Sequence, residues 1–129
     1  MTREELIDLV RNYFASVDAE DMPRVLSTLT EDCRFSVETH NVVLTGHQEI
    51  QGMLKRLWLH HAAVQHDRFR FVVELEAGKI AARFRVVNTF HDGETVTKAN
   101  CNFFTVRAGR FDTVVVYMAG ENTLVRGEG

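Results

Sequence analysis

The first third of the chain places its apolar residues at the spacing of an amphipathic helix. One stripe contains Leu6, Leu9, Val10, Tyr13, Phe14 and Val17, which is typical of a helix with a single buried face. Thr2 and Glu5 have the spacing of a capping box and predict where this helix begins. Asp21 and Pro23 predict a second, short helix that continues to about residue 29. We therefore expect the domain to begin with a helical hairpin.

The middle of the chain changes from a strand-like to a helical pattern. Residues 33–39 and 42–45 alternate or carry β-branched side chains on either side of a turn at His40 and Asn41, which predicts a short pair of strands. Thr45 and Gln48 then have the spacing of a second capping box. We expect it to open a third helix that ends near residue 62, with an apolar stripe made of Ile50, Met53, Leu54, Leu57, Trp58 and His61.

From about residue 64 onward, apolar and polar residues alternate with the period of two that strands have. Three turn signals, Gly78-Lys79, Asp92-Gly93 and Ala108-Gly109, divide this region into four long strands of an antiparallel meander. A two-residue turn at the first signal places Glu74 opposite Arg83, and one at the second places Phe84 opposite Cys101. This register decides which side chains face the helices.

The two predicted faces of the meander differ in composition. The face on which we expect the helices to pack is almost free of charge and carries Phe69, Phe71, Val73, Leu75, Ile80, Ala82, Phe84, Val86, Ala99, Cys101, Phe103, Val114, Val116 and Met118. The other face mixes polar and apolar side chains, namely Arg68, Arg70, Glu74, Arg83, Arg85, Lys98, Asn100 and Asn102 with Val87, Phe104, Val115 and Tyr117. Its apolar residues favour a wet homodimer interface, and a solvated, salt-bridged face is the alternative.

Length and composition limit the class of protein. With 129 residues, of which 45% are hydrophobic and 26% charged, the chain reads as one globular domain over residues 1–129. The formal net charge of -3 lacks the basic excess that a nucleic-acid partner requires. No apolar run approaches membrane-spanning length, and the first residues do not resemble a signal peptide. We therefore expect a cytoplasmic protein with no membrane or nucleic-acid partner.

The sequence contains no motif for a nucleotide or a metal. Its two cysteines, Cys33 and Cys101, both lie in strand-like apolar contexts, where a free cysteine usually behaves as a small buried hydrophobe, and we expect both to be reduced. Neither cysteines nor carboxylates fall at ligand spacing around any histidine, so we expect no metal site. Tyr13 on the core side of the first helix and Asp18 at its end point instead to a small pocket enzyme.

The order of the predicted elements resembles the cone-shaped α+β fold of the nuclear-transport-factor-2-like superfamily. That resemblance covers nearly the whole chain and implies three N-terminal helices packed on a curved, mostly antiparallel sheet with two short and four long strands. Within the superfamily, residues 13–35 with their Tyr-x4-Asp-x2-Asp spacing, the segment Thr45-Gly46-His47-Gln48-Glu49-Ile50 and the segment Val64-Gln65-His66 resemble SnoaL-like domains. These motifs are more specific for the fold than for one reaction.

The same resemblance implies an enzymatic chemistry. SnoaL-like proteins include polyketide cyclases, dehydratases, isomerases and dehydrochlorinases that work without a metal or an organic cofactor. The spacing of Tyr13, Asp18 and His66 is similar to that of the tyrosine, aspartate and histidine of cofactor-free dehydratases such as bile-acid dehydratase. By this resemblance, Asp18 fixes the tautomer of His66, which acts as the general base, and Tyr13 donates to the oxygen on which charge develops. The same groups could also run an isomerisation or an aldol cyclisation.

Each of these three residues also has a purely structural interpretation. Tyr13 fits a core position in an amphipathic helix, and Asp18 fits the start of a turn. His66 shares strand parity with Arg68, so strict alternation turns it away from the pocket. A β-bulge between His66 and Phe69 is needed to direct the imidazole inward.

Ketosteroid isomerase, a second relative, matches the chain less well. Tyr13 corresponds to the oxyanion tyrosine of that family, but the position of its catalytic base falls on Val37 and that of its proton-sharing aspartate falls on Cys101. Neither residue can do that work. Glu38 is adjacent to Val37, yet a shift of one residue would turn the whole strand over. A steroid-isomerase mechanism of that form is therefore disfavoured.

Two classes of function remain. The first is a cofactor-independent lyase or isomerase acting on a small, largely apolar carbonyl or hydroxyl compound. We expect its pocket to be lined by Trp58 near the mouth and by Phe84, Val86, Asn88, Cys101, Phe103, Val116 and Met118. The second is a noncatalytic small-ligand-binding or dimerising member of the same fold, in which Asp18 and His66 are only structural. Contact between the Asp18 carboxylate and His66 in an open cavity distinguishes the two.

Overall fold

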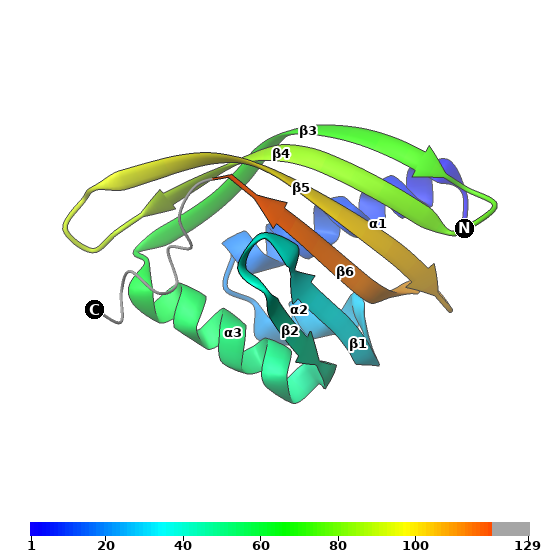
Figure 1. Ribbon diagram of the computed structural model, residues 1–129, viewed down its shortest axis with the longest axis horizontal. Coiled ribbons are helices and arrows are strands. Elements are labelled where there is room, and N and C mark those ends of the chain that lie inside the picture. Colours follow the sequence, from blue (N-terminus) through cyan, green and yellow to red (C-terminus); the bar gives the residue numbers. More distant parts are fainter. Residues whose placement is uncertain (120–129) are drawn as a thin grey trace.

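A curved six-stranded sheet arches over the helices (Figure 1). The computed structural model describes residues 1–119. Within that part of the chain the elements are α1 (Arg3–Asp18), α2 (Met22–Ser27), β1 (Leu29–Val37), a 3-10 turn (Glu38–His40), β2 (Val42–Thr45), α3 (Gly46–His60), β3 (Ala63–Glu74), β4 (Lys79–Thr89), β5 (Thr95–Arg107) and β6 (Arg110–Met118). The strand order is β2-β1-β6-β5-β4-β3. Among the strands of residues 1–119, only the β1 and β6 pair is parallel, so the expected α+β fold with a mostly antiparallel sheet is confirmed.

Side chains set where the long helices begin. The Thr2 hydroxyl accepts the Glu5 N–H at 3.1 Å and the Glu5 carboxylate accepts the Thr2 N–H at 2.9 Å, so the capping box predicted for α1 is present. The capping box predicted for α3 is wrong. There Glu49, and not Gln48, accepts the backbone N–H of Thr45 at 2.6 Å, and the Thr45 side chain makes no capping hydrogen bond.

The hydrophobic core lies between the concave face of the sheet and the helices. Its most deeply buried side chains come from both layers and include Leu6, Val10, Leu54, Ile80, Phe104 and Phe111. The apolar stripes predicted for α1 and α3 face this core. Burial of that surface is the main favourable contribution to the stability of such a two-layer domain.

Strand β3 contains the irregularity on which the direction of His66 depends. Between Asp67 and Arg70, β3 has one residue more than the facing stretch of β4. Arg68 adopts a left-handed backbone conformation there, with φ of 58°. An extra residue in one strand is a β-bulge, and it reverses the inward and outward alternation. His66 before the bulge and Phe69 after it can therefore both face the helices.

The β4–β5 hairpin differs from the prediction by one residue. Phe84 pairs with Asn100, and not with Cys101. The turn is wider than two residues, because the Phe90 N–H donates to the Glu94 carbonyl at 2.8 Å. Since successive side chains of a strand point to opposite faces, this shift exchanges the two faces of β5.

The exchange corrects the predicted composition of both faces. The concave face receives Lys98, Asn100, Asn102 and Phe104, all of them buried, whereas the convex face receives Ala99, Cys101 and Phe103. The first hairpin also has a longer turn than predicted, because Glu74 pairs with Lys79, and not with Arg83. That shift is by an even number of positions, so the inner face of β4 stays as predicted.

Candidate active site

A cavity of about 110 Å³ lies between the concave face of the sheet and helices α1 and α3. It is several times larger than the space that one water molecule needs. Five of the predicted pocket residues line it, namely Phe84, Val86, Asn88, Val116 and Met118. Tyr13 and His66 line the same cavity. Two of the three predicted catalytic side chains therefore border one apolar space.

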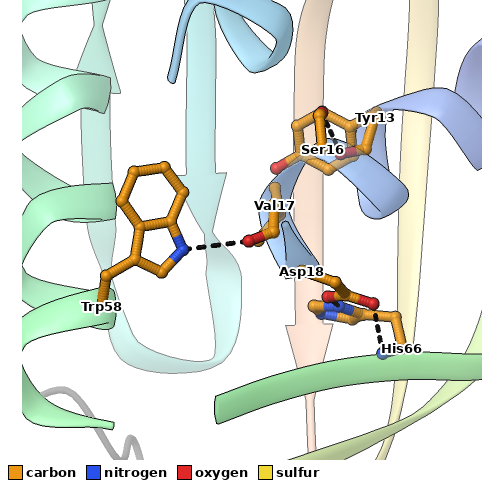
Figure 2. A network of polar contacts seen from close by, with 6 residues as sticks. All are labelled: Tyr13, Ser16, Val17, Asp18, Trp58 and His66. Carbon is orange, nitrogen blue, oxygen red and sulfur yellow. Dashed lines mark hydrogen bonds and ion pairs between the residues drawn. The ribbon is translucent and has the colours of Figure 1, made fainter. Parts of the chain in front are cut away.

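Asp18 and His66 are joined by two hydrogen bonds, and we call this pair the Asp18–His66 dyad (Figure 2). The Nδ1 of His66 lies 2.5 Å from Oδ1 of Asp18, and the backbone N–H of His66 donates to Oδ2 at 2.9 Å. An ionised carboxylate can only accept, so Nδ1 carries a proton. In the neutral ring, Nε2 then holds the lone pair and can act as a base.

The dyad joins the end of α1 to strand β3 (Figure 2). A carboxylate at a helix C-terminus faces the negative end of the helix dipole, which is unfavourable. The two hydrogen bonds from His66 offset that cost. Only 10% of the His66 side chain is exposed, and Phe14 and Phe84 pack against the imidazole with ring centroids 4.7 and 5.5 Å away. The ring is therefore held from several sides.

An ion pair on the convex face fixes the register next to the dyad. Arg85 donates from Nε to Oδ1 of Asp67 at 2.8 Å and from a terminal nitrogen to Oδ2 at 2.5 Å. These hydrogen bonds lower the pKa of Asp67 and raise that of Arg85. Asp67 lies between His66 and the bulge at Arg68. This bidentate contact therefore holds β3 to β4 next to the point where the inward and outward alternation of side chains reverses.

Trp58 supports the end of α1, and the prediction that it lines the pocket is wrong. Its indole N–H donates to the backbone carbonyl of Val17 at 3.0 Å (Figure 2). Val17 belongs to the last turn of α1, where carbonyl groups have no partner within the helix. The indole therefore ties α3 to the helix end that carries Asp18, and it is absent from the lining of the cavity.

Tyr13 is both a core residue and part of the cavity wall. Only 4% of it is exposed, and its ring makes edge contacts with Phe14, Phe104 and Phe111 at centroid distances of 5.0, 5.8 and 6.4 Å. Burial, assisted by the nearby Cys33, raises the pKa of Tyr13 well above its usual value of 10.0. The phenol therefore stays protonated and can serve as a hydrogen-bond donor.

A row of polar side chains on β5 forms part of the cavity wall that sequence reasoning missed. Lys98, Asn100 and Asn102 are 7%, 8% and 3% exposed and all line the cavity. The side-chain oxygen of Asn100 accepts the N–H of Ala119 at 3.3 Å. The side-chain oxygen of Asn102 is buried with no hydrogen-bond partner among the described residues. The signal that could have found this row is its spacing of two, which marks one face of a strand.

Cys101 and Phe103 were predicted in the pocket, and the register of β5 places both on the convex face. Cys101 is half-buried opposite Arg83, and Phe103 is 49% exposed beside the Tyr117 ring. Cys33, the other cysteine, is a buried free thiol. Burial and two nearby carboxylates raise the pKa of Cys33 to about 12. It therefore does not supply a thiolate nucleophile at neutral pH.

His61 follows α3 and is a buried neutral histidine. Its Nδ1 donates to the carbonyl of Leu57 at 2.7 Å, and its Nε2 has no partner among the residues that the structure describes. Burial lowers the pKa of His61, and the nearby positive charge of Lys98 contributes in the same direction. Within residues 1–119, no group of three or more histidine, cysteine, aspartate or glutamate side chains could hold a metal ion.

Comparison with known proteins supports both the fold and the family. A family model described as a SnoaL-like domain matches residues 1–126. A candidate polyketide cyclase of Xanthomonas campestris pv. campestris is 21% identical, with a TM-score of 0.82 over 89% of this chain and 90% of that one. PrhC from Penicillium brasilianum is 20% identical, with a TM-score of 0.82 over 92% of this chain and 83% of that one.

A third similar structure is a candidate ketosteroid isomerase of Kribbella flavida, 18% identical, with a TM-score of 0.72 over 92% of this chain and 81% of that one. These identities are low, so the structures show the shared fold and not a shared reaction. No curated protein matches the sequence. In the part of the chain that the structure describes, no helix is long and apolar enough to cross a membrane.

Proposed function

The chain belongs to the SnoaL-like domain family, and from this premise we propose that it is a cofactor-independent lyase or isomerase of the dehydratase or cyclase type. Its substrate is a small, largely apolar carbonyl or hydroxyl compound. The observation that carries this proposal is that His66 lines an apolar cavity and is hydrogen-bonded to the Asp18 carboxylate. Two of the similar structures are named as a candidate polyketide cyclase and a candidate ketosteroid isomerase, so the shared fold is compatible with a reaction of this class.

The proposed dehydration gives each of the three polar groups a role. Nε2 of His66 removes the proton from the carbon next to the substrate carbonyl, and Asp18 stabilises the imidazolium that forms. The neutral Tyr13 phenol donates to the carbonyl oxygen, where negative charge develops. The electrons of the broken C–H bond form the C=C bond while the β C–O bond breaks. His66 returns its proton to the departing hydroxyl, which leaves as water.

The same groups can support an isomerisation, in which His66 returns the proton to a different carbon. The mechanism typical of ketosteroid isomerase has no equivalent here, which agrees with the sequence comparison. Val37, at the position of that family's base, is an apolar residue of the cavity wall, and Cys101 lies on the convex face. The Glu38 carboxylate instead accepts a hydrogen bond from Ser36 at 3.1 Å. The proposed base is therefore His66.

A screen followed by an isotope experiment tests the proposal. Apolar β-hydroxy carbonyl compounds are first screened for those that raise the melting temperature of the protein, since a ligand of the folded state stabilises it. Each binder is then incubated in D2O and followed by NMR. We expect loss of the α proton signal and formation of the unsaturated product. A ligand that binds but undergoes neither exchange nor elimination would favour the noncatalytic alternative.

We also propose that the protein is a homodimer through the convex face of the sheet. Val72, Phe103 and Tyr117 are 74%, 49% and 45% exposed there, and exposed apolar residues concentrated on one face favour an interface. A second copy of the chain is the proposed occupant, because a face that carries both polar and apolar side chains can meet its own copy across a two-fold axis.

Sedimentation equilibrium at micromolar concentration tests the dimer. Phe103→Glu should shift the mass from dimer to monomer, because it places a charge in the proposed apolar contact. Leu59→Glu is the matched control, since Leu59 is 69% exposed on α3, away from the sheet. A monomeric parent protein would rule out the dimer and leave the proposed reaction untouched.

We propose the cytoplasm as the place where the protein works. Cys33 and Cys101 are both free, and a reducing compartment maintains free thiols. Fractionation of cells that produce the protein tests this location. Recovery outside the cytoplasmic fraction would contradict it.

A further inference from the structure

The amide of Asn102 on β5 is a polar group that the fold buries without a partner. Asn102 is 3% exposed, and its side-chain oxygen is buried with no hydrogen-bond partner within residues 1–119. The other such atoms in the described chain belong to Thr30, His40, His61 and Asp112, none of which lines the cavity. Asn102 does line it. A buried acceptor without a partner is unfavourable, so its place on the cavity wall points to a partner from outside the chain.

The neighbours of Asn102 explain why the fold does not satisfy the amide. Across the strands, Asn102 pairs with Ala82 of β4 and Val116 of β6, and both are apolar and buried. Along β5, the next residues on the same face are Asn100 and Phe104. Only Asn100 among these four could supply a hydrogen bond, and its side chain makes none with the Asn102 oxygen. A ligand in the cavity can therefore supply the partner that the sheet does not.

Asn102 lies apart from the proposed base. Asn102 pairs with Ala82, whereas His66 pairs with Val86, four residues further along β4. At about 3.3 Å per residue, these two rows of the sheet are about 13 Å apart. Both Asn102 and His66 line the cavity. One molecule in the cavity can therefore meet both side chains only if its two polar groups are well separated.

We propose that the amide of Asn102 binds a hydroxyl group of the substrate, separate from the group that reacts at His66. A hydroxyl suits an amide because it can donate to the amide oxygen and accept from the amide NH2 group. The substrate is therefore an apolar compound with the reacting carbonyl at one end and a hydroxyl toward the other. An analogue without this hydroxyl leaves the amide unpaired, so Asn102 determines specificity.

This inference rests on the proposed function for the reaction, but the binding subsite can be tested without turnover. The probes are phenol and toluene, which have nearly the same size and shape and differ in a hydroxyl and a methyl group. Their dissociation constants are measured by calorimetry on the full chain. The ratio of the toluene constant to the phenol constant is then compared between variants, since this comparison cancels the difference in hydration between the two probes.

Substitution of Asn102 gives the decisive comparison. Asn102→Leu keeps the branched shape of the side chain without its polar atoms. We expect it to lower the ratio about tenfold, because phenol loses a hydrogen bond that toluene never makes. Asn102→Ala is the second variant, used if the first does not fold. Asn12→Leu is the matched control and should keep the ratio of the parent protein, because Asn12 lies on α1, accepts a hydrogen bond from Arg24 at 2.7 Å and does not line the cavity.

The outcomes separate this subsite from the proposed reaction. An unchanged ratio in the Asn102 variant, or no binding of phenol at millimolar concentration, would overturn the inference. A ratio that falls in Asp18→Asn but not in Asn102→Leu would assign the phenol hydroxyl to the Asp18–His66 dyad, and would also overturn it. A protein whose ratio depends on Asn102 but that never removes a proton from any substrate would keep the subsite and refute the reaction.

Discussion

The two polar sides of the cavity are built differently. On the α1 and β3 side, the polar atoms of Asp18 and His66 are bound to each other, and two aromatic rings fix the imidazole. On the β5 side, Asn102 keeps a buried acceptor without a partner among the described residues. A group that transfers protons needs a fixed tautomer, whereas a group that binds a ligand needs free hydrogen-bonding capacity. Under the proposed function, we therefore expect the α1 and β3 side to react and the β5 side to bind.

Loss of the Asp18–His66 dyad should have the largest effect, and that effect should be on catalysis. We expect His66→Gln and Asp18→Asn each to lower kcat for a substrate found in the screen by about 10²- to 10⁴-fold, the usual contribution of a positioned general base. KM should change far less, because binding is assigned to the other side. Steady-state kinetics measure both constants, and His60→Gln on α3 is the matched histidine control. A fall in affinity with kcat unchanged would reverse the roles of the two sides.

A pair of phenylalanine variants tests which face of β5 points to the cavity and core. Phe104 is 1% exposed and Phe103 is 49% exposed. Phe104→Ala should lower the free energy of unfolding by about 3–5 kcal/mol, whereas Phe103→Ala should cost less than about 1 kcal/mol in the monomer. Urea denaturation measures both. If the two costs were reversed, Lys98 would face solvent and the β5 side would have no role in binding.

A substitution that disrupts the bulge of β3 should have an intermediate effect on stability and on catalysis. Arg68 has a positive φ, which a β-branched residue adopts only with strain. We expect Arg68→Val to lower the free energy of unfolding by about 1–3 kcal/mol and to reduce kcat by turning His66 away from Asp18. Arg68→Gly removes the same side chain but tolerates the conformation, so it is the matched control and should retain activity. Equal effects of the two variants would mean that the side chain matters and the bulge does not.

The smallest expected effect concerns the pH dependence of stability through Tyr13. Burial raises the pKa of Tyr13 in the folded protein above the ordinary value of 10.0. The folded state therefore holds this proton more tightly, and the stabilisation is fully present below about pH 10 and is lost as the pH rises further. Urea denaturation above that pH should show a decline of at most about 1.4 kcal/mol per pH unit from this group. Tyr13→Phe should remove this component of the decline.

The sequence predicted the helices well because their signals are local. The stripe on α1 and its Thr2–Glu5 capping box involve residues within a few turns of one another, and both are present. The bulge in β3 was stated as a condition for His66, but strand alternation alone could not show that it forms. Its formation depends on pairing with β4, including the Asp67–Arg85 contact, which is set by tertiary structure.

The β5 wall shows the opposite case. There, an error in the predicted length of one turn gave the wrong composition for the wall of the cavity. A two-residue turn at Asp92-Gly93 predicted Cys101 and Phe103 in the cavity, whereas the wider loop places Lys98, Asn100 and Asn102 there. Trp58 was misplaced for another reason, because its hydrogen bond to Val17 joins two helices that are far apart in the chain. Contacts of this kind are not contained in local periodicity.

The proposed reaction requires that Asp18 hold His66 with its proton on Nδ1 and its lone pair on Nε2. Histidine-ring 1H–15N NMR of the parent protein, at a pH where the ring is neutral, measures this tautomer directly. We expect a protonated Nδ1 and a bare Nε2 for His66, and a change toward the Nε2–H tautomer in Asp18→Ala. A protonated Nε2 in the parent protein, or identical His66 spectra in the two proteins, would contradict it.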